Sequence, residues 1–298
     1  MFPAKSNPVW AVFALVLLAL IWGYNWVVMK IALQYAPPFD FAAMRAFYGA
    51  LSLFLLMIAL GKPLKPQAIW GSFCYGMLHS GGAIGLLTWA LVSGGAGKTA
   101  ILSHTMAFWT LLFAWIFLGE RLRGAQWWSV MLAFCGLIFI LQPLSLNEEL
   151  ISKGVAIIAG ISWAISSLVA KKLNQKQALD LLSFTAWQLL FGSLPLIIIS
   201  LLVPTPPINW SGELIAALIY NVLPGTAIAW LLWLYGLRNL SAGSAGLTAL
   251  ATPVIGVLAA WLHLGEIPKP TESVGMLLIF VALVINSILT MKLLANQQ

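Results

Sequence analysis

The sequence predicts an all-helical integral membrane protein that is built from two related halves. Hydrophobic residues make up 61% of its 298 positions and charged residues only 8%, whereas about 25% of the residues are charged in an ordinary soluble domain. The apolar residues form runs of roughly 20, the length at which a helix crosses the hydrocarbon core of a bilayer. A pattern of five such runs occurs twice. These observations exclude a soluble fold, and the net charge of +7 reports membrane topology instead of nucleic-acid binding.

Proline, glycine and charged residues divide the chain into ten apolar runs, and we expect each run to be one membrane-spanning helix. The first run follows Lys5 as a signal peptide would. It is too long for one, however, and its Trp22, Asn25 and Lys30 have counterparts inside the protein, so we expect it to be retained. The predicted spans are residues 9–33, 39–60, 67–91, 97–117, 124–142, 153–172, 179–203, 210–237, 242–262 and 272–292.

The duplication is clearest at Leu118-Gly119-Glu120, which returns 146 residues later as Leu264-Gly265-Glu266. We therefore assign residues 1–147 to a first five-helix repeat and residues 148–298 to a second. Because five is an odd number, the second copy enters the membrane upside down. Inverted repeats of this kind form many secondary transporters, whose substrate site lies between the two repeats.

The distribution of lysine and arginine orients the chain, because these residues concentrate on the cytoplasmic side. With the N-terminus inside, four basic residues fall outside, namely Lys30, Lys98, Lys153 and Lys269. Ten fall inside: Lys5, Lys62, Lys65, Arg121, Arg123, Lys171, Lys172, Lys176, Arg238 and Lys292. We expect both termini to be cytoplasmic and the protein to lie in the inner membrane.

Several of these motifs resemble a known family. The stretch Leu118-Gly119-Glu120-Arg121 with Gln126-Trp127 and Gly136, and its second copy with Gly275, are similar to the paired EamA-type repeats of the drug/metabolite transporter superfamily. Residues 38–45 resemble the start of that family's second helix. Within the superfamily, the chain is most similar to YddG-type exporters of aromatic and other amino acids. The resemblance covers residues 9–292 and implies a ten-helix exporter. It also implies a central cavity lined by the first, third and fourth helices of each repeat.

Polar and aromatic residues on these helices are the candidate substrate contacts. His79 is at the centre of its span, and Tyr75 and Gly82 lie about one turn away, so the three share one helical face. Trp22 and Trp163 are repeat-related, and each precedes a polar residue by three positions. Packing or interhelical hydrogen bonding is the alternative role for each of them. The predicted substrate-binding set is Trp22, Asn25, Tyr75, His79, Ser103, His104, Trp163, Asn221 and Ser244.

Other polar motifs have structural interpretations. Residues 93–99 look like a phosphate-binding loop, but Val92 replaces the glycine that the motif requires. The amides at this helix start could instead bind a substrate carboxylate. Glu120 and Glu266 are expected to cap the next helix. Arg45 is expected to pair with Asp40 or to extend towards the membrane surface.

The acidic residues bear on the energy source. All eight fall in loops or at span ends, whereas proton-driven transporters usually keep a carboxylate at membrane depth. This distribution favours facilitated diffusion. The two cysteines, Cys74 and Cys135, lie in apolar spans, and we expect both to be buried without a disulfide or a metal.

The sequence therefore predicts an inner-membrane exporter of neutral, especially aromatic or large apolar, amino acids. The alternative is an exporter of other small metabolites or lipophilic drugs, with or without proton coupling. No paired carboxylates, metal-ligand spacing or activated nucleophile indicates an enzyme. We expect no catalytic residues, no cofactor, no metal and no nucleic-acid partner. The expected partners are a small-molecule substrate and the lipid bilayer, and the expected functional unit is a monomer.

Overall fold

The structure is a computed structural model that describes residues 8–119, 124–141, 148–176, 179–232, 235 and 242–295. Within these ranges, the side chains of residues 242–250 lie outside the description, as do those at a few helix ends. Each of the ten predicted apolar runs is helical over most of its described residues, and the exceptions lie mainly at the ends of runs, such as Trp210 and Ser211. The helices are α1 (Pro8–Ala32), α2 (Pro38–Ala59), α3 (Ile69–Gly76), η1 (Met77–Ile84), α4 (Gly85–Ser93), α5 (Ala96–His104), α6 (Met106–Leu118), α7 (Gly124–Leu141), α8 (Glu148–Lys176), α9 (Leu181–Leu202), α10 (Gly212–Val222), η2 (Leu223–Ile228), α12 (Ala242–Leu264) and α13 (Pro270–Ala295).

Length and composition make six of the described helical stretches able to cross a membrane. They are Val12–Ala32, Pro38–Ala59, Ala96–Phe117, Leu150–Ala170, Leu181–Leu202 and Gly212–Leu232. Three shorter apolar helices lie beside them, at Trp127–Ile140, Ala251–Leu264 and Pro270–Ile285. The protein is therefore an all-helical, multi-pass membrane protein.

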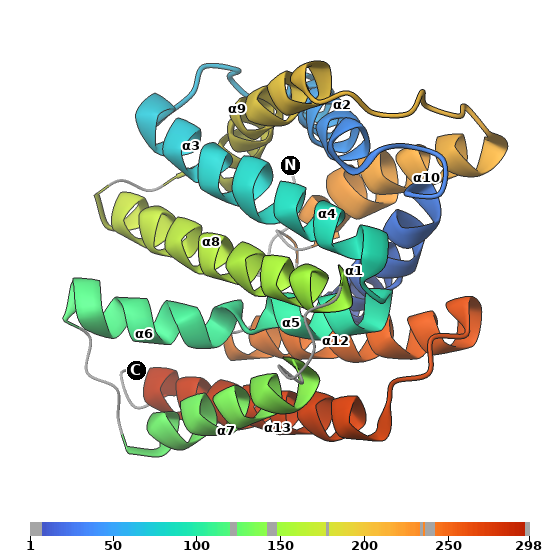
Figure 1. The fold of residues 1–298 in the computed structure, drawn as a ribbon. Coiled ribbons are helices and arrows are strands. Elements are labelled where there is room, and N and C mark those ends of the chain that lie inside the picture. Colours follow the sequence, from blue (N-terminus) through green and yellow to red (C-terminus); the bar gives the residue numbers. More distant parts are fainter. Residues whose placement is uncertain are drawn as a thin grey trace.

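Helices of the first half pack against helices of the second half throughout the molecule (Figure 1). The α2 and α9 helices form one pair, α1 lies against α12, and α7 lies along α13 at the opposite edge from α2 and α9. The α8 helix runs between the broken helix α3–η1–α4 and the helix pair α5–α6. The two halves therefore share one interior instead of forming separate bodies.

Two turns at the repeated Leu-Gly-Glu motif have the same backbone geometry. Gly119 ends α6 with a φ of 66°, and Gly265 follows α12 with a φ of 67°. Residues with a side chain rarely adopt this left-handed conformation, which explains why glycine stands at the end of both helices.

Helices α7 and α13 cross at a pair of glycines. A Cβ atom added to Gly136 would lie 2.7 Å from the carbonyl oxygen of Gly275, and one added to Gly275 would lie 2.6 Å from the carbonyl oxygen of Gly136. The hydrophobic effect does not drive helices together within a bilayer, because lipid tails are as apolar as the side chains. Close packing of the backbones stabilises their association instead. The two glycines of the family motif therefore hold the last helices of the two halves together.

Substituting alanine for Gly136 is expected to destabilise the fold by about 1–3 kcal/mol, the usual cost of overpacking. Gly154→Ala on α8 is the matched control, because nothing lies within 4 Å of the Cβ atom that it would add. Thermal unfolding of the two purified variants in detergent compares them. Equal unfolding temperatures would contradict the close crossing of α7 and α13.

Two π-helices interrupt the membrane helices at equivalent places in the two halves. The η1 helix begins at Met77 and η2 begins at Leu223, 146 residues later, which is the offset of the sequence repeat. The widened turns leave carbonyl groups that other side chains bind: Ser162 Oγ donates to the carbonyl of Leu78, and Trp22 Nε1 to that of Gly225. Each π-helix is thus bound by the first helix of the other half, η1 by α8 and η2 by α1. Segments of π-helix occur frequently at functional sites.

The expectation that both cysteines are buried is wrong. Cys74 on α3 and Cys135 on α7 are free and exposed. An apolar run has a lipid-facing side as well as an inward side, and cysteine is small and apolar enough for either.

Candidate functional site

An aromatic cluster forms where η1 meets α8. The ring of His79 lies 5.0 Å from that of Tyr75 and 5.1 Å from that of Trp163, measured between centroids. The ring of His104, at the end of α5, lies 6.4 Å from the other side of Trp163. Four of the nine predicted substrate-binding residues therefore come together from α3, η1, α5 and α8. We refer to Tyr75, His79, His104 and Trp163 as the aromatic cluster.

Polar groups accompany these rings. Ser166 Oγ donates to the carbonyl oxygen of Trp163 at 2.7 Å, and His104 Nδ1 lies 2.7 Å from the carbonyl oxygen of Ala100. The Nδ1 atom of His79 is buried and has no hydrogen-bond partner. Buried polar atoms are normally paired, so this nitrogen is available to a ligand. The aromatic cluster therefore combines an apolar surface with a few polar groups, as small-molecule sites do.

The contacts of Tyr75, His79 and Gly82 are consistent with the expected common face. The rings of Tyr75 and His79 contact each other. His79 and Gly82 both face α8, where the His79 ring lies 5.1 Å from that of Trp163 and a Cβ atom added to Gly82 would lie 2.6 Å from Ser162 Oγ.

A second group of predicted residues surrounds η2. Trp22 on α1 contacts Trp230 with a centroid distance of 6.3 Å, besides its hydrogen bond to Gly225. Asn25 lies one turn further along α1, and Asn221 lies in the last turn of α10, two residues before η2 begins. The side-chain oxygens of both asparagines are buried without hydrogen-bond partners. We refer to Trp22, Asn25 and Asn221 as the asparagine group.

Two predicted residues contribute less. The hydroxyl of Ser103 is fully buried and donates to the carbonyl of Ala100 in its own helix, so it is not free to face a substrate. The side chain of Ser244 lies outside the described residues.

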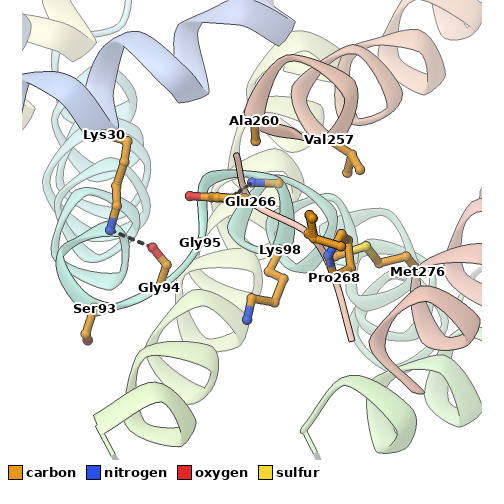
Figure 2. Close-up of a pocket in the computed structure, with 12 residues that line it drawn as sticks. Lys30, Ser93, Gly94, Gly95, Lys98, Val257, Ala260, Glu266, Pro268 and Met276 are labelled. Atoms are coloured by element: carbon orange, nitrogen blue, oxygen red, sulfur yellow. Dashed lines mark hydrogen bonds between the residues drawn. The ribbon is translucent and has the colours of Figure 1, made fainter. Parts of the chain in front are cut away.

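One end of the molecule contains a cavity of about 300 Å³ between α1, α5 and α12 (Figure 2). Its walls include Lys30, Gly94, Lys98 and Glu266. Lys30 Nζ donates to three carbonyl oxygens at the end of α4, those of Leu91, Val92 and Gly94, at 2.5, 3.0 and 2.9 Å. The cavity does not include the aromatic cluster. The charged groups in its walls are already engaged, Lys30 with backbone carbonyls, Glu266 with backbone N–H groups and Lys98 with Glu272.

Glu266 occupies the start of α5 at this cavity. Its carboxylate accepts hydrogen bonds from the backbone N–H groups of Ala96 at 2.9 Å and Gly97 at 3.2 Å. Capping by Glu266 was predicted, but its target is a helix of the first half and not the next helix, α13. These amides are therefore already occupied by a carboxylate, which argues against the expectation that they bind a substrate carboxylate. Glu120, the other predicted cap, lies outside the described residues.

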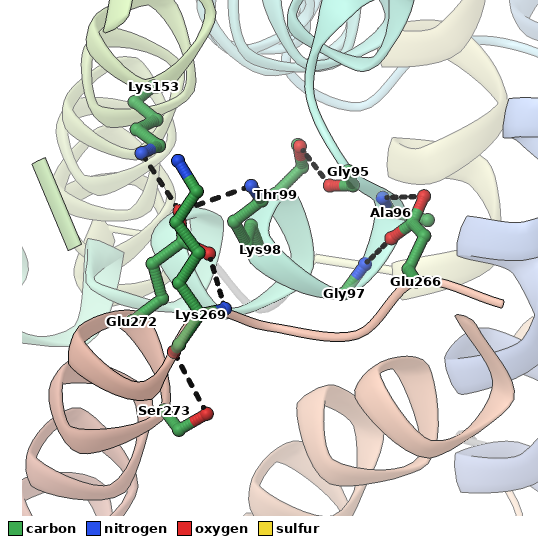
Figure 3. A network of polar contacts seen from close by, with 10 residues as sticks. All are labelled: Gly95, Ala96, Gly97, Lys98, Thr99, Lys153, Glu266, Lys269, Glu272 and Ser273. Carbon is green, nitrogen blue, oxygen red and sulfur yellow. Dashed lines mark hydrogen bonds and ion pairs between the residues drawn. The ribbon is translucent and has the colours of Figure 1, made fainter. Parts of the chain in front are cut away.

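Glu272 forms a buried charge cluster beside the cavity (Figure 3). Its Oε1 atom accepts from Lys98 Nζ at 3.2 Å and from Lys153 Nζ at 3.0 Å, and its Oε2 atom accepts from the backbone N–H of Lys269 at 3.0 Å. The Glu272 side chain is 1% exposed. The four lysines that were predicted to lie on the outer side of the membrane are thus all found at this end of the molecule. Their contacts with Glu272 join α5 of the first half to α8 and α13 of the second.

The comparison with known proteins follows the same two halves. Residues 9–142 and 152–288 each match the EamA-like transporter family. The chain belongs to the EamA-like transporter family. Membership indicates a membrane transporter of the drug/metabolite type and not an enzyme.

Similar proteins cover almost the whole chain. An uncharacterized transporter, YoaV, from Bacillus subtilis is 28% identical over 90% of this chain and 93% of its own length. A probable amino-acid metabolite efflux pump from Salmonella typhimurium is 27% identical over 92% and 93%, and the pseudopaline exporter CntI from Pseudomonas aeruginosa is 25% identical over 90% and 93%. A crystal structure that is 18% identical, with a TM-score of 0.66, covers 94% of this chain and 98% of its own and shows the same fold. These matches support an efflux transporter in general.

The expected ion pair between Arg45 and Asp40 is not present in this EamA-like structure. Asp40 accepts hydrogen bonds from the hydroxyls of Ser200 and Thr205, whereas Arg45 Nη1 contacts the sulfur of Met29 at 2.6 Å. The two residues are five positions apart, which places them on different faces of α2. Arg45 thus contacts α1 instead of Asp40.

The other end of the molecule has a simpler polar contact. Lys62 after α2 pairs with Asp180, which also caps α9 by accepting from the N–H of Ser183 at 3.0 Å. Burial alone would raise the pKa of Asp180, but the hydrogen bond from Lys62 and the one from Ser183 outweigh it, so the pKa lies below its ordinary value. This contact fastens α2 to α9 near their ends.

Proposed function

We propose that this EamA-like protein exports neutral amino acids, especially aromatic or large apolar ones. The observation that carries the proposal is the aromatic cluster, where Trp163 and Tyr75 flank an imidazole whose Nδ1 atom is buried and unpaired. An aromatic amino acid has an apolar ring and a polar head, and such a surface suits both. The printed name of one relative, a probable amino-acid metabolite efflux pump, supports the same substrate class. Within the superfamily, we assign the chain to the YddG-type exporters.

The proposed architecture is ten membrane spans in two inverted repeats, residues 1–147 and 148–298. The equivalent positions of η1 and η2 and the equivalent glycine turns support it. The aromatic cluster and the asparagine group lie beside η1 and η2 respectively, so we place the substrate between them. Alternating access then arises when one half rocks against the other around this site. We propose that the monomer carries out this cycle.

Expression in bacteria tests the substrate class. Cells that lack their own aromatic exporters and produce this protein are expected to tolerate higher concentrations of 4-fluorophenylalanine and to release L-phenylalanine faster. Cells that carry the empty vector are the reference. Unchanged tolerance and release, with the protein present in the membrane, would contradict the proposal.

We propose that the protein lies in the inner membrane with both termini in the cytoplasm. Single cysteines at Asn147 and at Lys65 are expected to react with a membrane-impermeant maleimide from outside and from inside respectively. Cys74 and Cys135 must be replaced first, because both are exposed. The opposite labelling pattern would contradict the orientation, and labelling of both sites from one side would contradict the odd number of spans between them and the inversion of the repeats.

A further inference from the structure

Two buried asparagines beside η2 carry side-chain oxygens that no donor satisfies. Asn25 on α1 is 7% exposed and Asn221 on α10 is 0% exposed. The Oδ1 atoms of both have no hydrogen-bond partner among the residues that the structure describes. The orientation of the Asn221 amide is fixed, because its nitrogen donates to the carbonyl oxygen of Ala217 at 2.9 Å. Buried polar atoms are normally paired, so two hydrogen-bond acceptors are available here.

Contacts at Gly225 bring α1 against η2. A Cβ atom added to Gly225 would have Oδ1 of Asn25 as its nearest side-chain neighbour, at 3.8 Å. Trp22, one turn before Asn25, donates from Nε1 to the carbonyl oxygen of Gly225 at 3.2 Å. The Thr226 hydroxyl donates to the backbone carbonyl of Asn221 at 2.8 Å, which joins η2 to the last turn of α10. The two asparagines therefore approach the start of η2 from its two sides, α1 and α10.

The repeat shows what glycine changes at this position. Asn221 and Tyr75 each lie two residues before a π-helix begins, and Gly225 and His79 are each the third residue of that π-helix. In the first half, the imidazole of His79 packs against the ring of Tyr75, with centroids 5.0 Å apart. Glycine supplies no side chain at the equivalent position of η2. Asn221 is therefore placed beside the space that an imidazole would fill, and Asn25 borders the same space from α1.

Two amide oxygens select a ligand that donates hydrogen bonds. An amide oxygen only accepts, so a carboxylate in this space would place oxygen against oxygen. A primary ammonium group has three N–H donors and no acceptor. Its positive charge also makes each hydrogen bond shorter and stronger than one from a neutral donor. The chemistry of the two oxygens therefore fits an ammonium group best.

We propose that Asn25 and Asn221 bind the ammonium group of the transported molecule and so restrict transport to amines. The two Oδ1 atoms accept two of its N–H donors. The equivalent π-helices then recognise different parts of one substrate, η1 through its aromatic neighbours and η2 through these amide oxygens. This inference rests on the proposed function for the position of the substrate, but it adds the group that selects the substrate class.

Binding to purified full-length protein in detergent tests the inference with two probes of nearly the same shape, 2-phenylethylamine and 2-phenylethanol. At neutral pH the first carries an ammonium group where the second carries a hydroxyl group. Wild-type protein is expected to bind the amine at least about tenfold more tightly than the alcohol, because hydrogen bonds to a charged group contribute more than those to a neutral one. The hydroxyl group also has a single hydrogen to donate, and so satisfies one of the two oxygens.

Leucine variants test the two oxygens separately. Asn25→Leu and Asn221→Leu each remove one amide oxygen and nearly keep the volume of the side chain. Each is expected to weaken binding of the amine by about fivefold or more, and to change binding of the alcohol less. Asn209→Leu is the matched control, since Asn209 is exposed between α9 and α10. It should leave the affinities for both probes unchanged.

The outcomes separate this inference from the proposed function. Equal affinity of the wild-type protein for the amine and the alcohol, or binding of neither, would overturn the inference, and this comparison stands even if the leucine variants do not fold. Stabilisation by sodium ions that depends on the two asparagines, without a preference for the amine, would assign the oxygens to a metal cation and also overturn it. Normal transport of L-phenylalanine by folded Asn25→Leu and Asn221→Leu would overturn the inference and leave the proposed function intact. An asparagine-dependent preference for the amine in a protein that does not transport L-phenylalanine would support the ammonium site and contradict the proposed function.

Discussion

Replacing Glu272 with glutamine is expected to lower the temperature of thermal unfolding by about 10 °C. The carboxylate is buried and binds Lys98 and Lys153, of which Lys153 is also buried. Removing one member of a buried ion pair costs about 3–5 kcal/mol because the remaining charge is left unpaired. For a chain of this size, 1 kcal/mol corresponds to about 2–4 °C. Glutamine keeps the shape of the side chain and can still accept from the N–H of Lys269. The loss of stability therefore reports the contribution of the negative charge alone.

Glu213→Gln is the matched control for this variant. Glu213 also lies in the first turn of a helix, α10, but it is exposed. Both variants should be measured in the same detergent, with a fluorescence or scattering readout of unfolding. If Glu272→Gln unfolds at the same temperature as Glu213→Gln, the charge cluster does not stabilise the junction of α5, α8 and α13.

Replacing Trp163 with alanine is expected to reduce the initial rate of L-phenylalanine transport by about tenfold or more. Trp163 contacts both His79 and His104, so its removal opens the aromatic cluster on two sides. Aromatic contacts contribute about 0.5–1.5 kcal/mol beyond the burial of their area, and 1.4 kcal/mol corresponds to a factor of ten. Tyr75→Ala and His79→Ala should lower transport in the same way.

The control for Trp163→Ala is Trp70→Ala, the same substitution at a tryptophan that is 78% exposed. Rates should be compared at equal amounts of folded protein, reconstituted into liposomes of one composition. Normal transport by all three variants of the aromatic cluster would show that the substrate passes elsewhere.

The arrangement at the charged end suggests how export could be gated. Glu266 and Glu272 come from the second half, and both bind α5 of the first half. We expect these contacts to separate when the protein opens at this end, since they would otherwise hold the halves together. The same contacts explain why the cavity there is lined by charged groups that are already paired.

The repeat and the helices could be predicted from the sequence because both are local properties. Runs of apolar residues give helices whatever their neighbours, and Gly119 and Gly265 mark helix ends because their positive φ angles exclude other residues. The two π-helices begin 146 residues apart, at the offset of the repeat, although nothing in the hydropathy pattern indicated that either segment would be a π-helix.

The errors concern contacts between helices. The partner of Glu266 is on a helix about 170 residues away, and Arg45 contacts Met29 instead of Asp40. Spacing along one helix cannot show which side faces lipid and which faces another helix, so the exposure of Cys74 was missed as well. The rings of Tyr75, His79 and Trp163 do lie in contact. Spacing along one broken helix could indicate the first pair, whereas only the family resemblance pointed to the helix that carries Trp163.

The most direct measurement of the proposed export is net flux from liposomes that contain the purified protein and L-phenylalanine. No acidic residue was predicted at membrane depth, and the described carboxylate that is buried, Glu272, lies in the first turn of its helix and is held by two lysines. L-phenylalanine is therefore expected to leave down its own gradient at equal pH, and in the same direction when a pH gradient is imposed. Uphill accumulation driven by a pH gradient alone, and abolished by His79→Ala, would contradict facilitated export.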